Sequence, residues 1–324
     1  TMNYLKYFSF LFIFSFISCE KDEIPIDPHN SGDIITQEII MDQDYKYQVF
    51  YNLKNNLIVS ENIKTNWDLG FDSRQDNHSI ILNSSTRMQA ALVSGVSFED
   101  INNVNSSIWN WDNPKGIQSG TAISCDTMGN NIYIIDRGYL INGNSRGYKK
   151  LMILELKDDS YEIRYADLDN SNDTVIQINK QIGLNFITYS FDINNTVLIY
   201  PGSDNWDLLF TQYTQLFSDT TTPSYLVTGV LINYLNNIQV ALDTLVAFND
   251  INISMVNNYS FSQNQDVIGY DWKNYDLDNN VYSINDDITY IIRDNDGRYF
   301  KIHFLDFYNN YGEKGYPKFE VQEL

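Results

Sequence analysis

The sequence predicts an all-β protein that consists of two similar, antiparallel β-rich units in tandem. Its 324 residues include 40 Asn and 24 Tyr, and this mixture favours polar turns between aromatic strands. Related segments recur about 140 residues apart along the chain, which is typical of an internal repeat. No window shows the clear apolar periodicity of about 3.6 residues that marks a long amphipathic helix, and residues 225–242 fit either a helix or strands.

The clearest recurrence ends in one short motif. Residues 51–71 and 189–210 each contain an aromatic strand, an Asn-Asn turn and a second apolar strand, and both close on Asn-Trp-Asp-Leu-x-Phe. Trp67 and Trp206 occupy equivalent positions in this motif. Residues at i, i+2 and i+4 of a strand share one face. We therefore expect each indole to point inward and to anchor the core of its own unit.

A second recurrence predicts a hairpin in each unit. Residues 131–154 and 289–305 each read as an apolar strand, a turn of Gly, Asn or Asp, and a strand that starts with Tyr, as β-hairpins do. The polar run 167–173 separates the two copies. The predicted domains are accordingly a first unit at 41–173 and a second unit at 174–324.

The N-terminal residues predict export and a lipid anchor. Lys6 precedes the apolar run 7–17, which is shorter than the roughly 20 residues of a membrane-spanning helix, so residues 1–18 read as a signal peptide. The run ends at Cys19 and resembles a bacterial lipobox, which predicts lipidation of Cys19 and a tether at 19–40. The charged stretch 20–23 is similar to the surface-export signal of Bacteroidota lipoproteins. The alternatives are an ordinary signal peptide and a solvated linker.

Charge and motif content exclude several function classes. The formal net charge is −21, from 42 acidic and 21 basic residues, and such a chain repels nucleic-acid phosphates. No Cys/His cluster, P-loop or dinucleotide-binding glycine motif occurs. Residues 143–147 match the pattern G-x-S-x-G, but they lie between two predicted strands instead of a strand and a helix. We predict no catalytic residue, no metal site and no enzyme.

An ordered set of motifs resembles the HmuY-like family of Bacteroidota surface lipoproteins. The resemblance implies an all-β haemophore-type protein at the outer membrane, which binds a ligand, with haem as the candidate, for uptake with a TonB-dependent transporter. The alternative is a non-haem accessory or interaction subunit of an outer-membrane protein complex. The motifs are 67–71, 80–85 and 90–95 in the first unit, and 206–210, 225–233, 290–297, 299–308 and 312–320 in the second.

Haem iron in a carrier needs His nitrogen or Met sulfur as an axial ligand. Relatives take such ligands from loops between the Trp-Asp motif and the C-terminal hairpin, where this chain has one Met and no His. His303 alternates within an apolar strand and reads as an ordinary strand residue. We therefore expect haem binding to be weak or Met-mediated, without a bis-histidine site. The candidate ligands are Met88, Met128, Met255 and His78.

Four triplets of Asp, Thr and a following residue resemble the O-glycosylation site of exported Bacteroidota proteins. Each would have to lie in an exposed loop to be modified. The candidate acceptors are Thr127, Thr174, Thr220 and Thr244.

Overall fold

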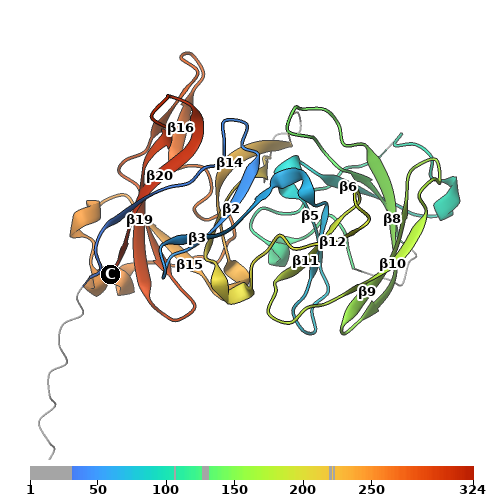
Figure 1. Ribbon diagram of the computed structural model, residues 1–324, viewed down its shortest axis with the longest axis horizontal. Coiled ribbons are helices and arrows are strands. Elements are labelled where there is room, and N and C mark those ends of the chain that lie inside the picture. The colour runs from blue at the N-terminus through green and yellow to red at the C-terminus, as the bar shows by residue number, and fades with distance from the viewer. Residues whose placement is uncertain (1–30, 106, 126–130, 219–220, 222) are drawn as a thin grey trace, which may run out of the picture. The chain divides into compact units, whose positions relative to one another are not determined.

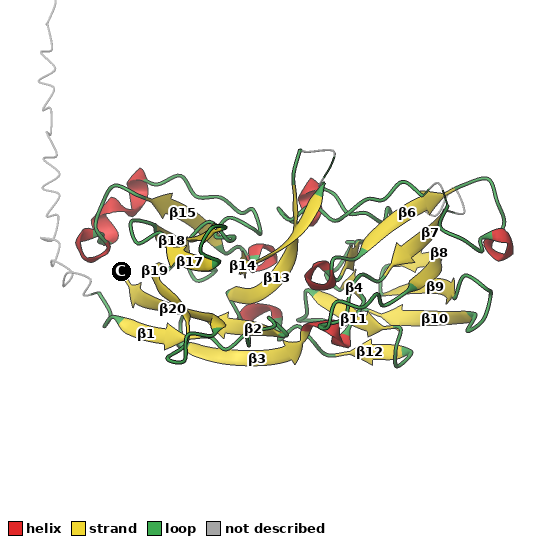
Figure 2. Cartoon of the chain, turned by 90° about the horizontal axis from the view of Figure 1, so that it is seen from above, coloured by secondary structure: helices red, strands yellow, loops and turns green. Residues whose placement is uncertain are grey.

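Antiparallel sheets form the framework of the described chain (Figures 1 and 2). The computed structural model describes residues 31–105, 107–125, 131–218, 221 and 223–324. The helical elements of these residues are 3-10 turns of three to six residues, so the predicted all-β fold class is confirmed. These turns are η1(Lys64–Asn66), η2(Ser84–Thr86), η3(Phe98–Asp100), η4(Ile117–Ser119), η5(Ser203–Asn205), η6(Tyr234–Asn236), η7(Phe248–Asp250) and η8(Ile253–Asn258).

One pair of sheets encloses the largest apolar cluster, which draws on β2, β13, β14, β15 and β18–β20. The five-stranded sheet has the order β1(Ile35–Glu38), β20(Lys314–Glu323), β19(Tyr299–Tyr308), β18(Thr289–Arg293), β15(Gln239–Asp243). The four-stranded sheet has the order β14(Ser224–Ile232), β13(Leu208–Leu216), β2(Tyr47–Asn52), β3(Leu57–Ile63).

A second pair of sheets encloses a second cluster. Its five-stranded sheet has the order β10(Thr174–Asn179), β9(Ser160–Ala166), β8(Tyr148–Lys157), β7(Ile132–Asp136), β6(Gln89–Val93). Its four-stranded sheet has the order β12(Asn195–Val197), β11(Phe186–Ser190), β4(Leu69–Asp72), β5(Ile80–Leu82). The strands β16(Lys273–Asp276) and β17(Val281–Ile284) form a separate two-stranded ribbon.

β7 and β18 contain continuous apolar runs because both faces of each strand are buried. Both strands have a neighbouring strand on each side and contain four successive buried residues. One face looks into the main cluster, and the other packs against the segments around η3 and η7. Strands that are buried on both sides read as continuous apolar runs instead of alternating ones.

Strands from before and after the predicted boundary at 173/174 pair with one another in both halves of the fold. The β2–β3 hairpin joins β13, and β11 joins β4, so each hairpin lies in a sheet completed by the other part of the chain. Figure 1 shows blue β2 close to β14, which belongs to the same sheet, and β11 and β12 close to β5 in the other four-stranded sheet. The edge strands do the same, because β1 pairs with β20 and β10 with β9. Residues 31–324 form one compact unit, and the division into 41–173 and 174–324 stays a prediction about the sequence repeat.

Equivalent residues of the two Trp-Asp motifs make equivalent contacts. The backbone N–H of Asp68 donates to the Tyr189 carbonyl at 2.8 Å, and that of Asp207 donates to the Tyr51 carbonyl at 2.9 Å. The side-chain amides of Asn83 and Asn233 cap the carbonyls of the two motif tryptophans. Two buried lysines also match: Lys150 donates to the carbonyls of Phe98 and Ile101, and Lys301 to those of Phe248 and Ile251.

The two motif tryptophans are buried, as expected, but they do not anchor separate cores. Each is 3 % exposed, and both belong to a third cluster with Phe50 and Tyr200. Their rings lie 6.1 Å (Trp67) and 6.0 Å (Trp206) from that of Tyr200. The expectation of one anchor per unit is wrong because the exchanged hairpins bring both motifs to the same place.

Candidate functional site

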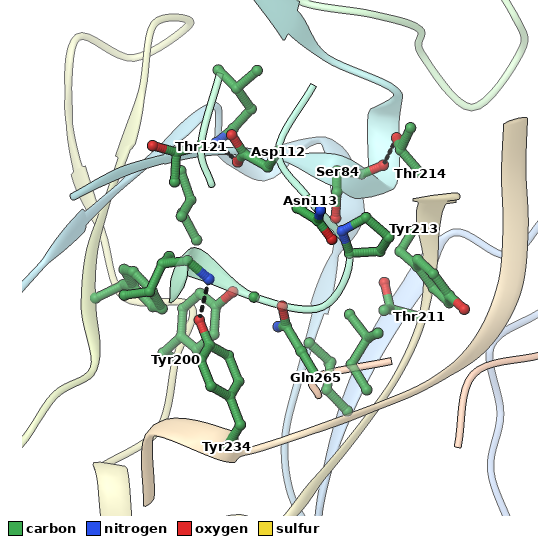
Figure 3. Close-up of a pocket in the computed structure, with 18 of the residues that line it drawn as sticks. Ser84, Asp112, Asn113, Thr121, Tyr200, Thr211, Tyr213, Thr214, Tyr234 and Gln265 are labelled. Atoms are coloured by element: carbon green, nitrogen blue, oxygen red, sulfur yellow. Dashed lines mark hydrogen bonds between the residues drawn. The ribbon is translucent and has the colours of Figure 1, made fainter. Parts of the chain in front are cut away.

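A small cavity lies where the exchanged strands meet (Figure 3). Its volume is about 50 Å³, which suits one or two water molecules and is far below the roughly 300 Å³ of a ligand pocket. Tyr200, Tyr213 and Tyr234 supply aromatic walls, and polar side chains such as Gln48 and Gln265 complete the lining. Without a local rearrangement, the cavity does not admit a macrocycle.

The segment 112–121 forms one wall of this cavity. Both carboxylate oxygens of Asp112 hold it in place, since they accept the backbone N–H groups of Leu82 at 2.6 Å and Ala122 at 2.8 Å. Burial raises the pKa of Asp112 to about 7. Gly116 has a φ of +109°, and a Cβ there would lie 2.7 Å from the Tyr234 ring. A side chain at this position would therefore push the wall away from the cavity.

We expect Asp112 to make stability depend on pH. Its pKa in the folded protein is above the ordinary value of 3.8, so its stabilising effect is complete below about pH 4 and is lost as the pH rises toward 7. In Asp112→Asn the free energy of unfolding should no longer fall between pH 4 and pH 7 for this reason. One backbone N–H also loses its acceptor, which costs about 1–3 kcal/mol at low pH. Urea unfolding at pH 4 to 7.5 measures both effects. The exposed Asp158→Asn is the control, and an unchanged slope in Asp112→Asn would contradict the assignment.

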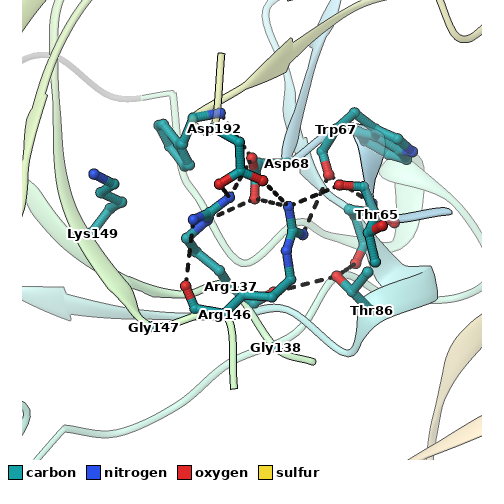
Figure 4. A network of polar contacts seen from close by, with 12 residues as sticks. Thr65, Trp67, Asp68, Thr86, Arg137, Gly138, Arg146, Gly147, Lys149 and Asp192 are labelled. Atoms are coloured by element: carbon teal, nitrogen blue, oxygen red, sulfur yellow. Dashed lines mark hydrogen bonds and ion pairs between the residues drawn. The ribbon is translucent and has the colours of Figure 1, made fainter. Parts of the chain in front are cut away.

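A buried ion-pair network surrounds the first Trp-Asp motif (Figure 4). Asp68 is fully buried and accepts two bonds from Arg137, through Nε at 2.9 Å and Nη2 at 3.1 Å. Arg146 lies 3.0 Å from the same carboxylate, and Asp192 pairs with both arginines. Arg146 belongs to the G-x-S-x-G segment, which is a loop between β7 and β8. This segment therefore balances buried charge.

The candidate haem ligands of the described chain lie in separate surroundings. Met88 is 1 % exposed in the second cluster, and Met255 is half-buried in η8. The His78 Nε2 atom is 2.8 Å from the Lys157 carbonyl oxygen, and its ring contacts Tyr161. None of these side chains lines the small cavity or any of four further cavities formed by described residues. Cys19 and Met128 lie outside the described residues.

His303 is the histidine that does line a cavity. The depression has a volume of about 430 Å³ and also includes Phe248, Asp286 and Asp287. The imidazole stacks on Phe248 with ring centres 4.0 Å apart, and its Nε2 lies 2.9 Å from Glu320 Oε2. Sequence alternation in β19 could place this residue on a face, but only the packing of the segment around η7 shows that a hollow lies beside it.

Two of the predicted glycosylation acceptors can be located. Thr244 is exposed in the turn after β15 and lines the same hollow as His303. Thr174 is half-buried at the start of β10, and its hydroxyl donates to the Asn172 carbonyl at 3.0 Å. Thr127 and Thr220 lie outside the described residues.

Neither a metal-binding cluster nor a membrane-spanning helix occurs among the described residues. There, no group of three or more His, Cys, Asp or Glu side chains is arranged to hold a metal ion. No helix of the described chain is long and apolar enough to span a membrane.

The fold defines an all-β protein, built from exchanged antiparallel hairpins around buried aromatic and ionic clusters. The model of one family, described as HmuY protein, matches residues 44–321. This match spans most of the chain, and the protein belongs to the HmuY family. No curated protein matches the chain.

Three solved structures show some similarity to this chain. Apo PinO from Porphyromonas gingivitis is 7 % identical, with 90 % of this chain and 97 % of that chain covered and a TM-score of 0.30. The apo HmuY analog TFO of Tannerella forsythia is 9 % identical, with 91 % and 98 % covered and a TM-score of 0.25. A proposed HmuY-like heme-binding protein from Bacteroides vulgatus ATCC 8482 is 13 % identical, with 53 % and 90 % covered and a TM-score of 0.18. The family assignment therefore rests on the match to residues 44–321.

Proposed function

We propose that the protein is a surface-exposed outer-membrane lipoprotein of the HmuY type, which binds a ligand for uptake with a TonB-dependent transporter. The family match over residues 44–321 carries this proposal. The signal-like segment 1–18 and Cys19 precede the matched region, which is the order expected of an exported, lipid-anchored binding protein. The net charge of −21 suits an extracellular surface and disfavours nucleic acid as the ligand.

Haem is the ligand class to test first, and the geometry disfavours two axial histidines. Both ligands would have to reach the iron from opposite faces of the macrocycle, each at about 2 Å. His78 lies before β5 and contacts Tyr161 on β9, whereas His303 belongs to β19. The sheets that contain these strands share no backbone pairing. We infer that no pair of histidines holds any bound haem, which leaves the thioethers as the candidate ligands.

We expect titration of the mature protein with haem to produce either a weak or Met-mediated spectrum, or no shift of the Soret band. A bis-histidine site would instead produce a sharp low-spin spectrum. The variants His78→Ala and His303→Ala separate the two histidines, and Met88→Leu and Met255→Leu test the thioethers without removing much apolar volume. A low-spin spectrum that is lost in both histidine variants would overturn the inference.

The alternative function is a non-haem accessory subunit of an outer-membrane complex. It is favoured by the placement of Met88, Met255 and His78 away from the five cavities, and by the small volume of the cavity at the strand exchange. An unchanged Soret band at all haem concentrations would select this alternative. Co-purification with a transporter from detergent-solubilised outer membranes would then identify the complex.

We expect radiolabelled palmitate to be incorporated into the wild-type protein and not into Cys19→Ala, because Cys19 is the proposed acceptor. External protease should degrade the protein on intact cells, since the charged stretch 20–23 is proposed to direct surface display. Ser18→Ala is a neighbouring control that keeps the cysteine. Equal labelling of wild type and Cys19→Ala would exclude the anchor, and protection from protease would exclude surface display.

A further inference from the structure

Asp207 is the counterpart of Asp68, and its environment is different. Phe191 donates its backbone N–H to Asp68 Oδ2 at 2.8 Å, and Leu53 donates in the same way to Asp207 Oδ2 at 2.7 Å. The motif positions and these contacts make the two aspartates equivalent. Asp207 is 6 % exposed, so its carboxylate is buried almost as deeply as that of Asp68.

The two arginines that neutralise Asp68 have no counterpart at the equivalent positions around Asp207, and the nearby Arg298 pairs with Asp294 and Asp296 instead. Arg137 follows β7 directly, and the residue that follows β18 is Asp294. Arg146 lies two residues before β8, and Gly297 lies two residues before β19. An acid and a glycine thus stand where the other motif has guanidinium groups. In the described chain, Asp207 Oδ1 has no hydrogen-bond or ion-pair partner.

This carboxylate lines an open pocket with a volume of about 670 Å³, which lies within the range of small-ligand sites. Asp204, Asp294 and Asp296 also line it, against two cations, Lys54 and Arg298. Arg298 lies 2.7 Å from Asp294 and 3.5 Å from Asp296, and Lys54 lies 3.2 Å from Asp296. Both resident cations are therefore engaged by other acids, and the pocket keeps an excess of negative charge beside Asp207.

We propose that the pocket at Asp207 binds a guanidinium group, supplied by a free guanidino compound or by an arginine side chain. A guanidinium offers paired N–H donors that match a carboxylate in one plane. The chain itself shows this geometry at Asp68, where Arg137 donates from Nε and Nη2. A metal ion fits less well, since the described residues contain no group of three or more suitable ligands for one. The site is independent of haem.

The charge state of the pocket supports the same ligand. Burial raises the pKa of Asp207 to about 6, with Asp294 and Asp296 acting in the same direction and Arg298 against them. Lys54 and Asp204 are the other charged groups that face the pocket. A cation binds the carboxylate and not the acid. Affinity should therefore rise as the pH increases from 5 to 7.5, and binding near pH 6 should release a proton.

The test is an NMR titration of the ¹⁵N-labelled protein, in which the Leu53 amide reports on Asp207. The probes are methylguanidinium, methylammonium, L-arginine and the capped tripeptide Gly-Arg-Gly, at pH 5 and 7.5. We expect saturable shifts with the guanidinium probes, an affinity loss of about tenfold or more in Asp207→Asn, and a change of less than about twofold in the charge-matched control Asp158→Asn. If the tripeptide binds more tightly than L-arginine, the natural ligand is an arginine side chain. If L-arginine binds more tightly, the ligand is a free guanidino compound.

A second variant keeps the proposal falsifiable if Asp207→Asn folds poorly. Asp294→Arg places a guanidinium at the position that corresponds to Arg137, and it should block the site against added probes. Thermal melting followed by circular dichroism establishes that each variant is folded. Equal affinity for methylammonium, unchanged affinity in both folded variants, or no response of Leu53 to any guanidinium probe would overturn the proposal. The haem spectrum should be the same in wild type and Asp207→Asn, so failure here leaves the proposed function standing.

Discussion

Replacing Trp206 with Ala is expected to lower the free energy of unfolding by about 3–5 kcal/mol, the range for truncating a large buried aromatic side chain. Its ring packs edge-on against Phe50 at 5.0 Å and lies 6.0 Å from Tyr200. Trp67→Ala should cost about as much, because Trp67 contacts Tyr200 and also donates its indole N–H to Gln48 Oε1 at 2.9 Å. Urea unfolding followed by circular dichroism measures both losses.

The double variant tests whether the two tryptophans share one core. Residues that contact a common partner show interaction energies of about 0.5–3 kcal/mol, whereas independent sites add. Since both indoles contact Tyr200, we expect the combined loss to differ from the sum of the single losses. Leu245→Ala, at a side chain that is 94 % exposed, is the control for truncation as such. Simple additivity, or single losses below about 1 kcal/mol, would contradict the shared cluster.

Replacing Asp68 with Ala is expected to cost about 3–5 kcal/mol, because it removes the buried carboxylate that two buried guanidinium groups share. Asp192, which is half exposed to solvent, would be the remaining anionic partner of Arg137 and Arg146, and the Phe191 N–H would lose its acceptor. Exposed ion pairs contribute little by comparison.

The matched control for this variant is Asp207→Ala. It removes an equivalent side chain that has one backbone N–H as its partner and no arginine, so we expect a loss of about 1–3 kcal/mol. Chemical unfolding at pH 7.5 compares the two variants. An equal cost at both positions would show that the arginines around Asp68 do not depend on this carboxylate.

Local features of the fold were predictable because they depend on neighbouring residues. The hairpins at 131–154 and 289–305 appear as β7–β8 and β18–β19, since apolar runs flank residues that favour turns. The motif tryptophans are buried, as expected of such large apolar side chains. Strand alternation did not place them, because they precede β4 and β13 and pack in a different cluster from the Leu and Phe of their motifs. The family could be inferred from the order of such motifs, and the match to residues 44–321 confirms it.

The candidate sites were predictable only in part. Donor atoms for haem can be counted in a sequence, but their convergence depends on chain segments that pack from far apart. Asp68 and Asp207 look alike in their motifs. What distinguishes them lies some 70 to 90 positions later, where Arg137 follows β7 and Asp294 follows β18. The unneutralised carboxylate of Asp207 therefore could not be recognised before the loops at 137–147 and 294–298 were placed.

The sequence by itself determined the all-β class, the repeated Trp-Asp motifs and the family, because side-chain periodicity and turn chemistry act within a few residues. Only the tertiary structure decided which strands pair. A β-strand offers backbone hydrogen-bonding groups on both edges, and these groups hardly differ between sequences. The local sequence of β2 therefore does not specify β13 as its neighbour. This exchange of strands brings Trp67 and Trp206 against one tyrosine. It also sets which charged side chains surround each motif aspartate.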